Sequence, residues 1–304
     1  MPETQKCRLD ITSAVLNQPD HNWIFEARDL AAVSGVELGI QVHNSASDEV
    51  LAMAAVTGLP LSFHSPVQGR FLFNFAAENS DLYWQMIEEQ YLLMQKYKVD
   101  RTVFHCFLMT DAVIGAFGHG KTYGECMLAG FRADLVRTPE SRFVRDFTDS
   151  DEFIMRRKRV KDNLRRLREL HPDCLWCVEN DFPAYTSGML RGEDLAFIDH
   201  ETCFDTGHMW AASKMLDRDF YCELDNALAG GKVRMVHLHA SRYTMDMPHE
   251  DFGDGHLPLT TPTEIDLAQV VSKCRNAGTR HFVLEIGNAS LEDIKIFLSY
   301  YNED

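Results

Sequence analysis

Eight short apolar runs divide this chain, and their number limits the folds that it can adopt. They lie near residues 7–13, 36–42, 60–64, 101–105, 174–179, 201–205, 233–239 and 281–286. The segments between them show the apolar spacing or the capping residues of helices. We expect these helices near residues 21–33, 47–57, 80–97, 151–170, 212–228, 263–277 and 290–301.

Strands that alternate with helices form βαβ units and a parallel sheet. Eight strands close into a (β/α)8 barrel, a fold that suits a chain of 304 residues. An open doubly wound sheet is the alternative, but residues at its two far edges could not meet. The sequence shows no internal repeat, low-complexity tract or linker. We therefore expect an α/β protein with a single domain over residues 1–304, folded as a (β/α)8 TIM barrel.

One long segment interrupts the alternation of strands and helices. Residues 106–150 follow the fourth predicted strand and precede its helix. Segments of this kind in compact domains are usually functional lids or partner surfaces. Because this one begins at the carboxyl end of a strand, we expect an insertion or lid on the active-site side of the barrel.

Nine side chains of metal-binding type stand at or just after the ends of predicted strands. They are His64, His105, Glu179, Asp205, His208, His237, Asp254, His256 and Glu285. Carboxylates and imidazoles are costly to bury unless they are paired or bound to a cation. The active site of a barrel lies at the carboxyl ends of its strands and takes residues from several of them. Any one of the nine alone would more often be structural, but together they predict a metal site.

Four of the nine would form the centre of that site, because they follow consecutive strands, from the fifth to the eighth. The four are Glu179, Asp205, His237 and Glu285. Imidazole and carboxylate are ligands of divalent cations, and catalytic sites keep one position open for water or substrate. We expect one to three ions per chain, of Mn, Mg, Co or Zn.

The ordered motifs also resemble a known family. They are Phe63-His64-Ser65-Pro66, Phe104-His105, Val178-Glu179-Asn180, Asp205-Thr206-Gly207-His208-Met209, His237-Leu238-His239, Asp254-Gly255-His256-Leu257 and Glu285. Each motif is weak alone, but the ordered set resembles the xylose isomerase-like TIM-barrel superfamily. This superfamily includes sugar isomerases and epimerases, and endonuclease IV, which belongs to AP endonuclease family 2.

Resemblance to the sugar isomerases and epimerases implies that the four central residues hold one Mn²⁺- or Mg²⁺-like ion. Glu179 and Glu285 would then move the proton of a sugar carbon, through a metal-stabilised enediolate. The resemblance also implies that His208 contacts the substrate and that Arg242 is similarly placed. His239 lies near the same face and is a further candidate for substrate binding.

Resemblance to endonuclease IV implies instead that all nine positions hold three zinc ions, which cleave a phosphodiester of abasic DNA. His64, His105 and Glu179 would hold the first ion. Glu179 would bridge to a second ion, and His208, Asp254 and His256 would hold the third. Two departures favour a small polyhydroxylated substrate over nucleic acid. Val67 stands where an aromatic residue is expected, and residues 260–262 replace a glycine-rich tail.

Two further patterns carry rival interpretations. Residues 115–122, from Gly115 to Thr122, match the P-loop pattern and make an NTPase a remote alternative. A P-loop requires a strand directly before the loop and a helix directly after it.

The basic run 156–168 could contact nucleic acid. Its apolar residues Val160, Leu164 and Leu167 have helical spacing, so we expect the basic residues to form a solvated helix face.

The formal net charge of −16 disfavours broad, salt-dependent binding to nucleic acid or to an anionic membrane. No apolar run is long enough for a membrane span, and the first residues lack the apolar core of a signal peptide.

The eight cysteines show no framework spacing, which favours a reducing cytoplasm. Cys174 and Cys177 form a CxxC inside an apolar run, and we expect both in a buried strand. A homo-oligomer is compatible with the sequence.

Overall fold

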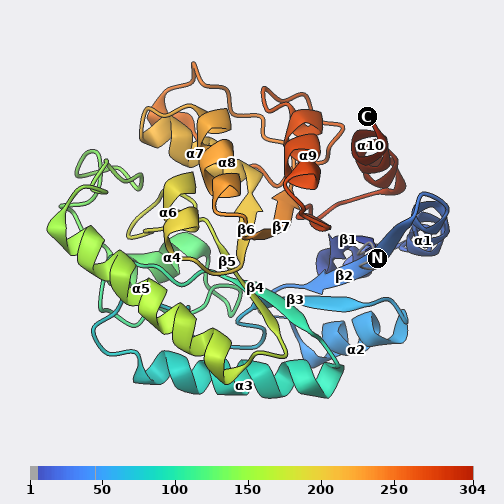
Figure 1. Cartoon of the computed structure of the whole chain (residues 1–304), viewed down its shortest axis with the longest axis horizontal. Coiled ribbons are helices and arrows are strands. Elements are labelled where there is room, and N and C mark those ends of the chain that lie inside the picture. Colours follow the sequence, from blue (N-terminus) through green and yellow to red (C-terminus); the bar gives the residue numbers. More distant parts are fainter. Residues whose placement is uncertain (1–5, 45, 304) are drawn as a thin grey trace.

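The computed structural model describes residues 6–44 and 46–303. Eight parallel strands form a barrel in chain order (Figure 1). The last strand pairs with the first, which closes the barrel. The strands are β1 (Cys7–Thr12), β2 (Val36–Val42), β3 (Leu61–Ser65), β4 (Arg101–Phe104), β5 (Leu175–Glu179), β6 (Thr202–Asp205), β7 (Val233–Leu238) and β8 (His281–Leu284). The predicted (β/α)8 barrel is therefore confirmed, with every strand at its expected place.

Helices surround the barrel (Figure 1). They are α1 (Trp23–Val33), α2 (Asp48–Val56), α3 (Asp81–Tyr97), α5 (Asp151–Leu170), α6 (Gly192–Phe197), α7 (Thr206–Met215), α8 (Phe220–Ala229), α9 (Leu267–Asn276) and α10 (Leu291–Asn302). Several begin at a side chain that accepts a hydrogen bond from a backbone N–H three residues later, as Ser47, Ser150 and Asp266 do. None of the helices in the described residues is long and apolar enough to cross a membrane.

The helix expected over residues 212–228 is two helices, and this prediction is wrong. Asp217 adopts a left-handed φ of 52°, which interrupts the helical path after α7. Asp219 then caps α8 by accepting a hydrogen bond from the backbone N–H of Cys222 at 2.8 Å. α7 also begins earlier than expected, directly after Asp205, and α6 had no counterpart among the predicted helices.

Inside the barrel, period-two alternation turns every second strand residue towards the axis. One buried interior cluster consists of Val103, Cys177, Cys203, Met235 and Val283. The residues two positions further along these strands are His105, Glu179, Asp205, His237 and Glu285. Strand geometry therefore directs five of the predicted metal ligands inwards, one layer above this apolar cluster and at the carboxyl end of the barrel.

The insertion 106–150 contains a short α-helix, α4 (Tyr123–Met127), followed by a 3-10 turn (Leu128–Gly130). Isolated β-bridges join the insertion to the rest of the molecule. Phe71 pairs with Gly115, and Leu108 pairs with Ser187. Gly115 thus lies in a bridge between two loops, and the helix that follows the P-loop pattern has five residues. The strand–loop–helix unit that a P-loop requires does not occur within this part of the described chain.

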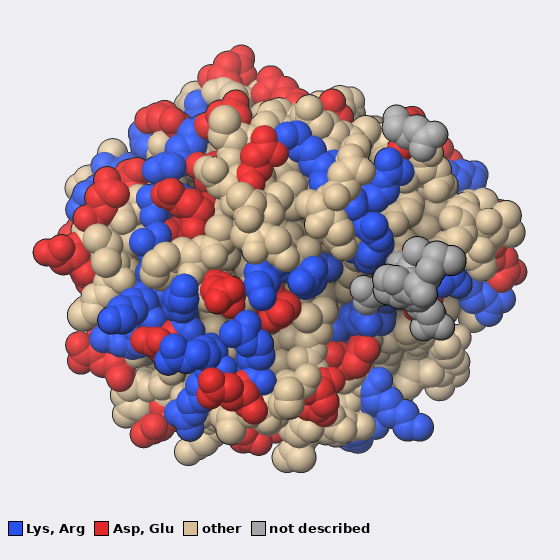
Figure 2. Space-filling model, in the orientation of Figure 1, with Lys and Arg blue, Asp and Glu red and all other residues tan. Residues whose placement is uncertain are grey.

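The basic run on α5 is only partly solvated, so the expectation of a solvated face is wrong for two of its residues. Arg156 is buried and forms ion pairs with Asp111 at 2.9 Å and Glu152 at 2.8 Å. Arg157 pairs with Asp194 at 2.6 Å. These contacts link α5 to the insertion and to α6. On the face shown in Figure 2, basic side chains gather where α5 runs, and acidic side chains are interspersed with them.

The expectation that both cysteines of the CxxC pattern lie in a buried strand is confirmed for Cys177, in β5, and is wrong for Cys174. Cys177 is fully buried in the barrel interior, and burial raises the pKa of its thiol well above the ordinary value. Cys174 is partly buried just before the strand, and both thiols are free. A buried, protonated thiol is a structural residue rather than a reactive one.

Candidate metal centre

The central four residues meet at the carboxyl end of the barrel. One ligand atom from each of Glu179, Asp205, His237 and Glu285 lies within 4.8 Å of every other. The Nδ1 atom of His237 lies 2.8 Å from Oε1 of Glu179 and 3.1 Å from Oε2 of Glu285. The same nitrogen lies 3.8 Å from Oδ2 of Asp205. Four strands therefore bring together the four residues that the sequence places at the centre.

His64 and His105 join this group through Glu179. The Nε2 atom of His64 lies 3.1 Å from Oε2 of Glu179, and Nε2 of His105 lies 3.4 Å from the same oxygen. The other carboxylate oxygen of Glu179 faces His237. Glu179 therefore lies between two sets of imidazoles, in the position of a carboxylate that could bridge two cations.

His208, Asp254 and His256 form a third group beside the first two. The Nε2 atoms of both histidines lie 3.0 Å from Oδ2 of Asp254. His256 also lies 3.5 Å from Glu285, through Nδ1 and Oε2, and this contact links the third group to the centre. All nine predicted residues are thus assembled, and their role as metal ligands stays a prediction.

The charges of the cluster stabilise one another. Burial is the largest single effect and opposes ionisation of Glu179 and Glu285. The surrounding imidazoles together outweigh it and hold the pKa of each carboxyl well below its usual range, His237 with His105 for Glu179 and His237 with His256 for Glu285. Burial would lower the pKa of His256, but Asp254 beside it raises that pKa to about 10. Without a cation, the protonated imidazoles therefore supply the positive charge that the buried carboxylates need.

The residues fit a divalent cation. The Oε2 atoms of Glu179 and Glu285 are buried and have no hydrogen-bond partner of acceptable geometry. An unsatisfied buried acceptor is costly, and a cation would remove that cost. Imidazole and carboxylate together form the donor set of zinc, manganese and related ions. Both the arrangement and the donor types therefore support the predicted site.

Two residues that the sequence interpretation missed hold the candidate ligands in place. Asp181 accepts a hydrogen bond from Nδ1 of His105 at 2.8 Å, and the backbone N–H groups of residues 188–189 donate to the same carboxylate. Asn180 exchanges two hydrogen bonds with the backbone of Asp205. A carboxylate behind a metal-binding histidine orients its ring. The only sequence signal was their position directly after Glu179.

The predicted substrate contacts have different outcomes. His208 lines the cavity above the cluster. His239 is fully buried behind it, where its Nε2 atom lies 3.2 Å from Oδ2 of Asp205. His239 therefore supports a candidate ligand and does not face the cavity.

Arg242 does not line the cavity. Its side chain is exposed and lies over the ring of Tyr243, with 5.3 Å from the guanidinium carbon to the ring centroid. The chain leaves β7 after Leu238, and this turn carries Arg242 away from the barrel axis. Arg142, from the insertion, lines the cavity instead.

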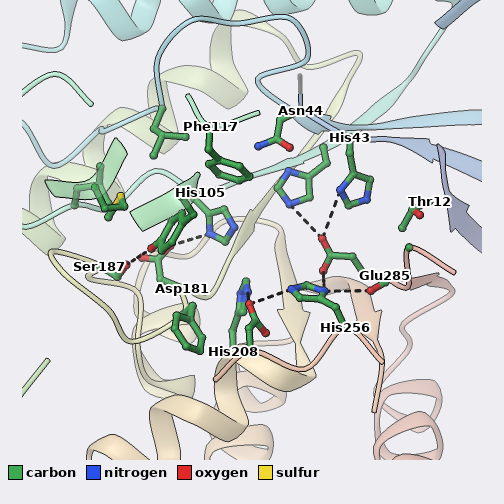
Figure 3. A pocket seen from close by; sticks show the side chains of 18 of the residues that line it. Thr12, His43, Asn44, His105, Phe117, Asp181, Ser187, His208, His256 and Glu285 are labelled. Atoms are coloured by element: carbon green, nitrogen blue, oxygen red, sulfur yellow. Dashed lines mark hydrogen bonds and ion pairs between the residues drawn. The ribbon is translucent and has the colours of Figure 1, made fainter. Parts of the chain in front are cut away.

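A cavity of about 530 Å³ lies over the cluster. One side is polar and carries His64, His105, His208, Asp254, His256 and Glu285, and the opposite side comes mainly from the insertion. Figure 3 shows the ring of Phe117 across the cavity from His256 and Glu285. Glu285 reaches this space, whereas Glu179 is fully buried beneath it. His43, at the end of β2, also lines the cavity and lies 3.7 Å from Glu285.

No protein-family model matches this chain, and no curated protein matches it. Solved structures do match over nearly the whole length. A D-tagatose 3-epimerase-like protein is 12% identical, with a TM-score of 0.59 and 96% of each chain covered. The 3-keto-D-glucoside 4-epimerase from E. coli is 15% identical, with a TM-score of 0.54, 97% of this chain and 99% of that chain covered.

Endonuclease IV from Thermus thermophilus is 15% identical, with a TM-score of 0.50 and 97% of each chain covered. The two epimerases and the endonuclease are the two kinds of protein that the ordered sequence motifs resemble. Identities this low show a shared fold and do not choose between the two activities. The chain therefore shares the closed (β/α)8 barrel fold of these proteins.

Proposed function

We propose that this protein is a divalent-metal-dependent isomerase or epimerase that moves a proton on a small polyhydroxylated molecule. The observation that carries the proposal is the cavity of about 530 Å³ between the cluster and the insertion. Its size lies within the range of about 300–1,000 Å³ that is common for small-molecule sites. Among the similar structures, the 3-keto-D-glucoside 4-epimerase acts on a substrate of this kind, as its name states.

Glu285 is the residue best placed for proton transfer. It lines the cavity, and its carboxyl has a pKa well below the usual range because His237 and His256 together outweigh the large opposing effect of burial. An ionised carboxylate next to a substrate carbon can act as a general base. Glu179 is fully buried beneath His64 and His105. Because it does not reach the cavity, it is better placed to bind the metal than to take the first proton from the substrate.

The other residues of the cluster would hold and orient the reacting groups. Glu179, Asp205, His237 and Glu285 would bind a cation, which when bound would polarise a substrate carbonyl and so acidify the adjacent carbon. His208 lines the cavity beside the cluster and can hydrogen-bond a substrate hydroxyl. The insertion excludes water from one side of the cavity, which strengthens these electrostatic interactions.

One observation favours a second candidate function. The complete third group, His208, Asp254 and His256, could hold a further cation beside the centre. With Glu179 placed to bridge two more, the cluster could accommodate the three zinc ions of an endonuclease IV-like phosphodiesterase. The net charge of −16 and the enclosing insertion favour a small substrate over abasic DNA.

The test combines metal content with proton exchange. Protein purified without chelator would be analysed for metal per chain, then incubated in D₂O with a panel of ketoses and their phosphates. We expect deuterium incorporation at the carbon next to the carbonyl, observed by NMR, and its loss in Glu285→Gln. About three tightly bound zinc ions, cleavage of an abasic-site duplex and no deuterium exchange would instead establish the hydrolase.

A further inference from the structure

The wall of the cavity opposite the metal cluster is apolar. It consists of Leu72, Leu108, Phe117, Tyr123 and Met127. A free sugar carries hydroxyl groups around its whole ring, and each group that loses water without gaining a partner costs about 1–3 kcal/mol. Among these five side chains only Tyr123 carries a polar group, and Arg142 and Ser187 line the cavity beside them. A substrate made only of hydroxylated carbons therefore fits one side of the cavity and not the other.

The apolar wall is a packed structure and not a loose loop. Leu108 and Met127 belong to a small buried core of the insertion, against which Phe117 and Tyr123 pack. The rings of Phe117 and Tyr123 meet edge to face, with their centroids 5.6 Å apart. A Cβ atom on Gly124 would lie 2.9 Å from the Tyr185 hydroxyl, so α4 is closely seated. The insertion thus has a core of its own that holds these rings at the cavity.

The backbone fixes the wall to the barrel on two sides. The N–H of Leu72 donates to the carbonyl of Ile114 at 2.9 Å, and the N–H of Ala116 donates to the carbonyl of Arg70 at 2.9 Å. These bonds fix the backbone segment that leads into Phe117. On the other side, the N–H of Met109 donates to the carbonyl of Thr186. Preorganised aromatic surfaces bind flat ligands with little loss of side-chain entropy.

We propose that this wall is a second subsite, which takes a flat apolar ring attached to the polyhydroxylated part of the substrate. The proposal rests on the proposed function, because that function places the polyhydroxylated part against Glu285 and the imidazoles. Figure 3 shows Phe117 facing this polar side across the cavity. Edge-to-face or offset packing on Phe117 and Tyr123 would hold the ring. The substrate class is a sugar-like molecule that carries an aromatic group, in preference to a free sugar.

Matched pairs of ligands test the subsite. The metal-loaded protein would be titrated by calorimetry with the phenyl and methyl β-glycosides of glucose, galactose, mannose and xylose. These glycosides are acetals and carry no free carbonyl, so binding is measured without proton transfer. We expect the phenyl member of at least one pair to bind on the order of tenfold more tightly than its methyl partner. Equal binding within every pair, or no binding of any member, would overturn the proposal.

Variants of the insertion locate the effect. Phe117→Ala should abolish the preference for the phenyl member, and Phe117→Leu should retain part of it. Phe131→Ala is the matched control, because Phe131 lies in the same insertion but is exposed and away from the cavity. The thermal midpoints of all three variants would be compared. A phenyl preference that survives in a folded Phe117→Ala would contradict the assignment of this wall.

The two proposals can fail separately. A phenyl preference that depends on Phe117, without deuterium exchange into any ketose or phenyl-substituted keto sugar, would keep the subsite and reject the isomerase. Deuterium exchange into free ketoses, with no phenyl preference in any glycoside pair, would keep the isomerase and reject the subsite.

Discussion

The Nδ1 atom of His237 lies 2.8 Å from Oε1 of Glu179, and both side chains are fully buried. The two residues are far apart in the chain, on β7 and β5, and each lies two positions after a member of the same apolar interior layer. Removing one partner of a buried ion pair strongly destabilises the protein, because the remaining charge is left buried and unpaired. This contact is therefore where the candidate metal centre is most sensitive to substitution.

Glu179→Gln should weaken metal binding throughout the cluster, because the carboxylate lies between His64 and His105 on one side and His237 on the other. Loss of a residue that only orients a ligand costs about 10–100-fold in metal affinity, so loss of Glu179 should cost at least about 100-fold. Competition with a chelator of known affinity measures this. Glu37→Gln, at an exposed position of β2, is the control. Unchanged metal affinity in Glu179→Gln would reject the assigned site.

Asp181→Asn should weaken metal binding without removing any candidate ligand. The Asp181 carboxylate accepts a hydrogen bond from Nδ1 of His105 at 2.8 Å and so directs Nε2 towards Glu179. We expect a loss of about tenfold in metal affinity. Asp162→Asn, on the outer helix α5 and remote from the cluster, serves as the comparison. Equal affinities in the two variants would show that Asp181 does not orient His105.

Gly207→Ala should destabilise the fold close to the candidate site. A Cβ atom at this position would lie 2.2 Å from Cε1 of His239, whose Nε2 atom contacts Asp205. Displacing a buried ring costs about 1–3 kcal/mol, measured as the free energy of unfolding in urea. Gly115→Ala is the control, since its new Cβ atom would meet its nearest neighbour at 3.8 Å. Equal unfolding free energies in both variants would contradict the crowding of His239.

Acid should destabilise the protein through His281, which lies in the lower barrel away from the metal cluster. Burial lowers the pKa of His281 to about 4, against the opposing effect of Asp10, and the nearby Arg8 and Arg101 add to the lowering. The unfolded chain binds a proton near pH 6.5, whereas the folded chain does not until about pH 4. Stability is therefore lost as the pH falls from about 6.5 to about 4.

His281→Gln should remove this part of the pH dependence. Between pH 6.5 and pH 4, the unfolding free energy of the unmodified protein should fall further than that of His281→Gln. The difference between the two falls should be at most about 3 kcal/mol. Urea unfolding at several pH values measures the difference, with the exposed His21→Gln as the matched variant. Parallel curves for His281→Gln and the unmodified protein would reject the assignment.

The strands were predictable because their apolar runs are short, regular and bounded by polar segments, as in the run that ends at Glu179. Helix boundaries were less predictable, since the break between α7 and α8 depends on the left-handed backbone of Asp217. Amphipathic spacing continues across that break and conceals it. The roles of Arg156 and Arg157 were missed for a similar reason, because their partners Asp111 and Asp194 are distant in the chain.

The sequence by itself determined the barrel and the inward direction of the candidate ligands, because the strand period of two carries both the apolar layer and the residues above it. Only the tertiary structure decided which side chains face the cavity. Glu285 reaches it, Glu179 lies beneath it, and Arg242 turns away from it. The apolar wall around Phe117 also depends on tertiary contacts, because the insertion is positioned by backbone bonds to loops that precede and follow it. Local periodicity cannot encode such contacts, since they join segments whose separation in the chain follows no repeat.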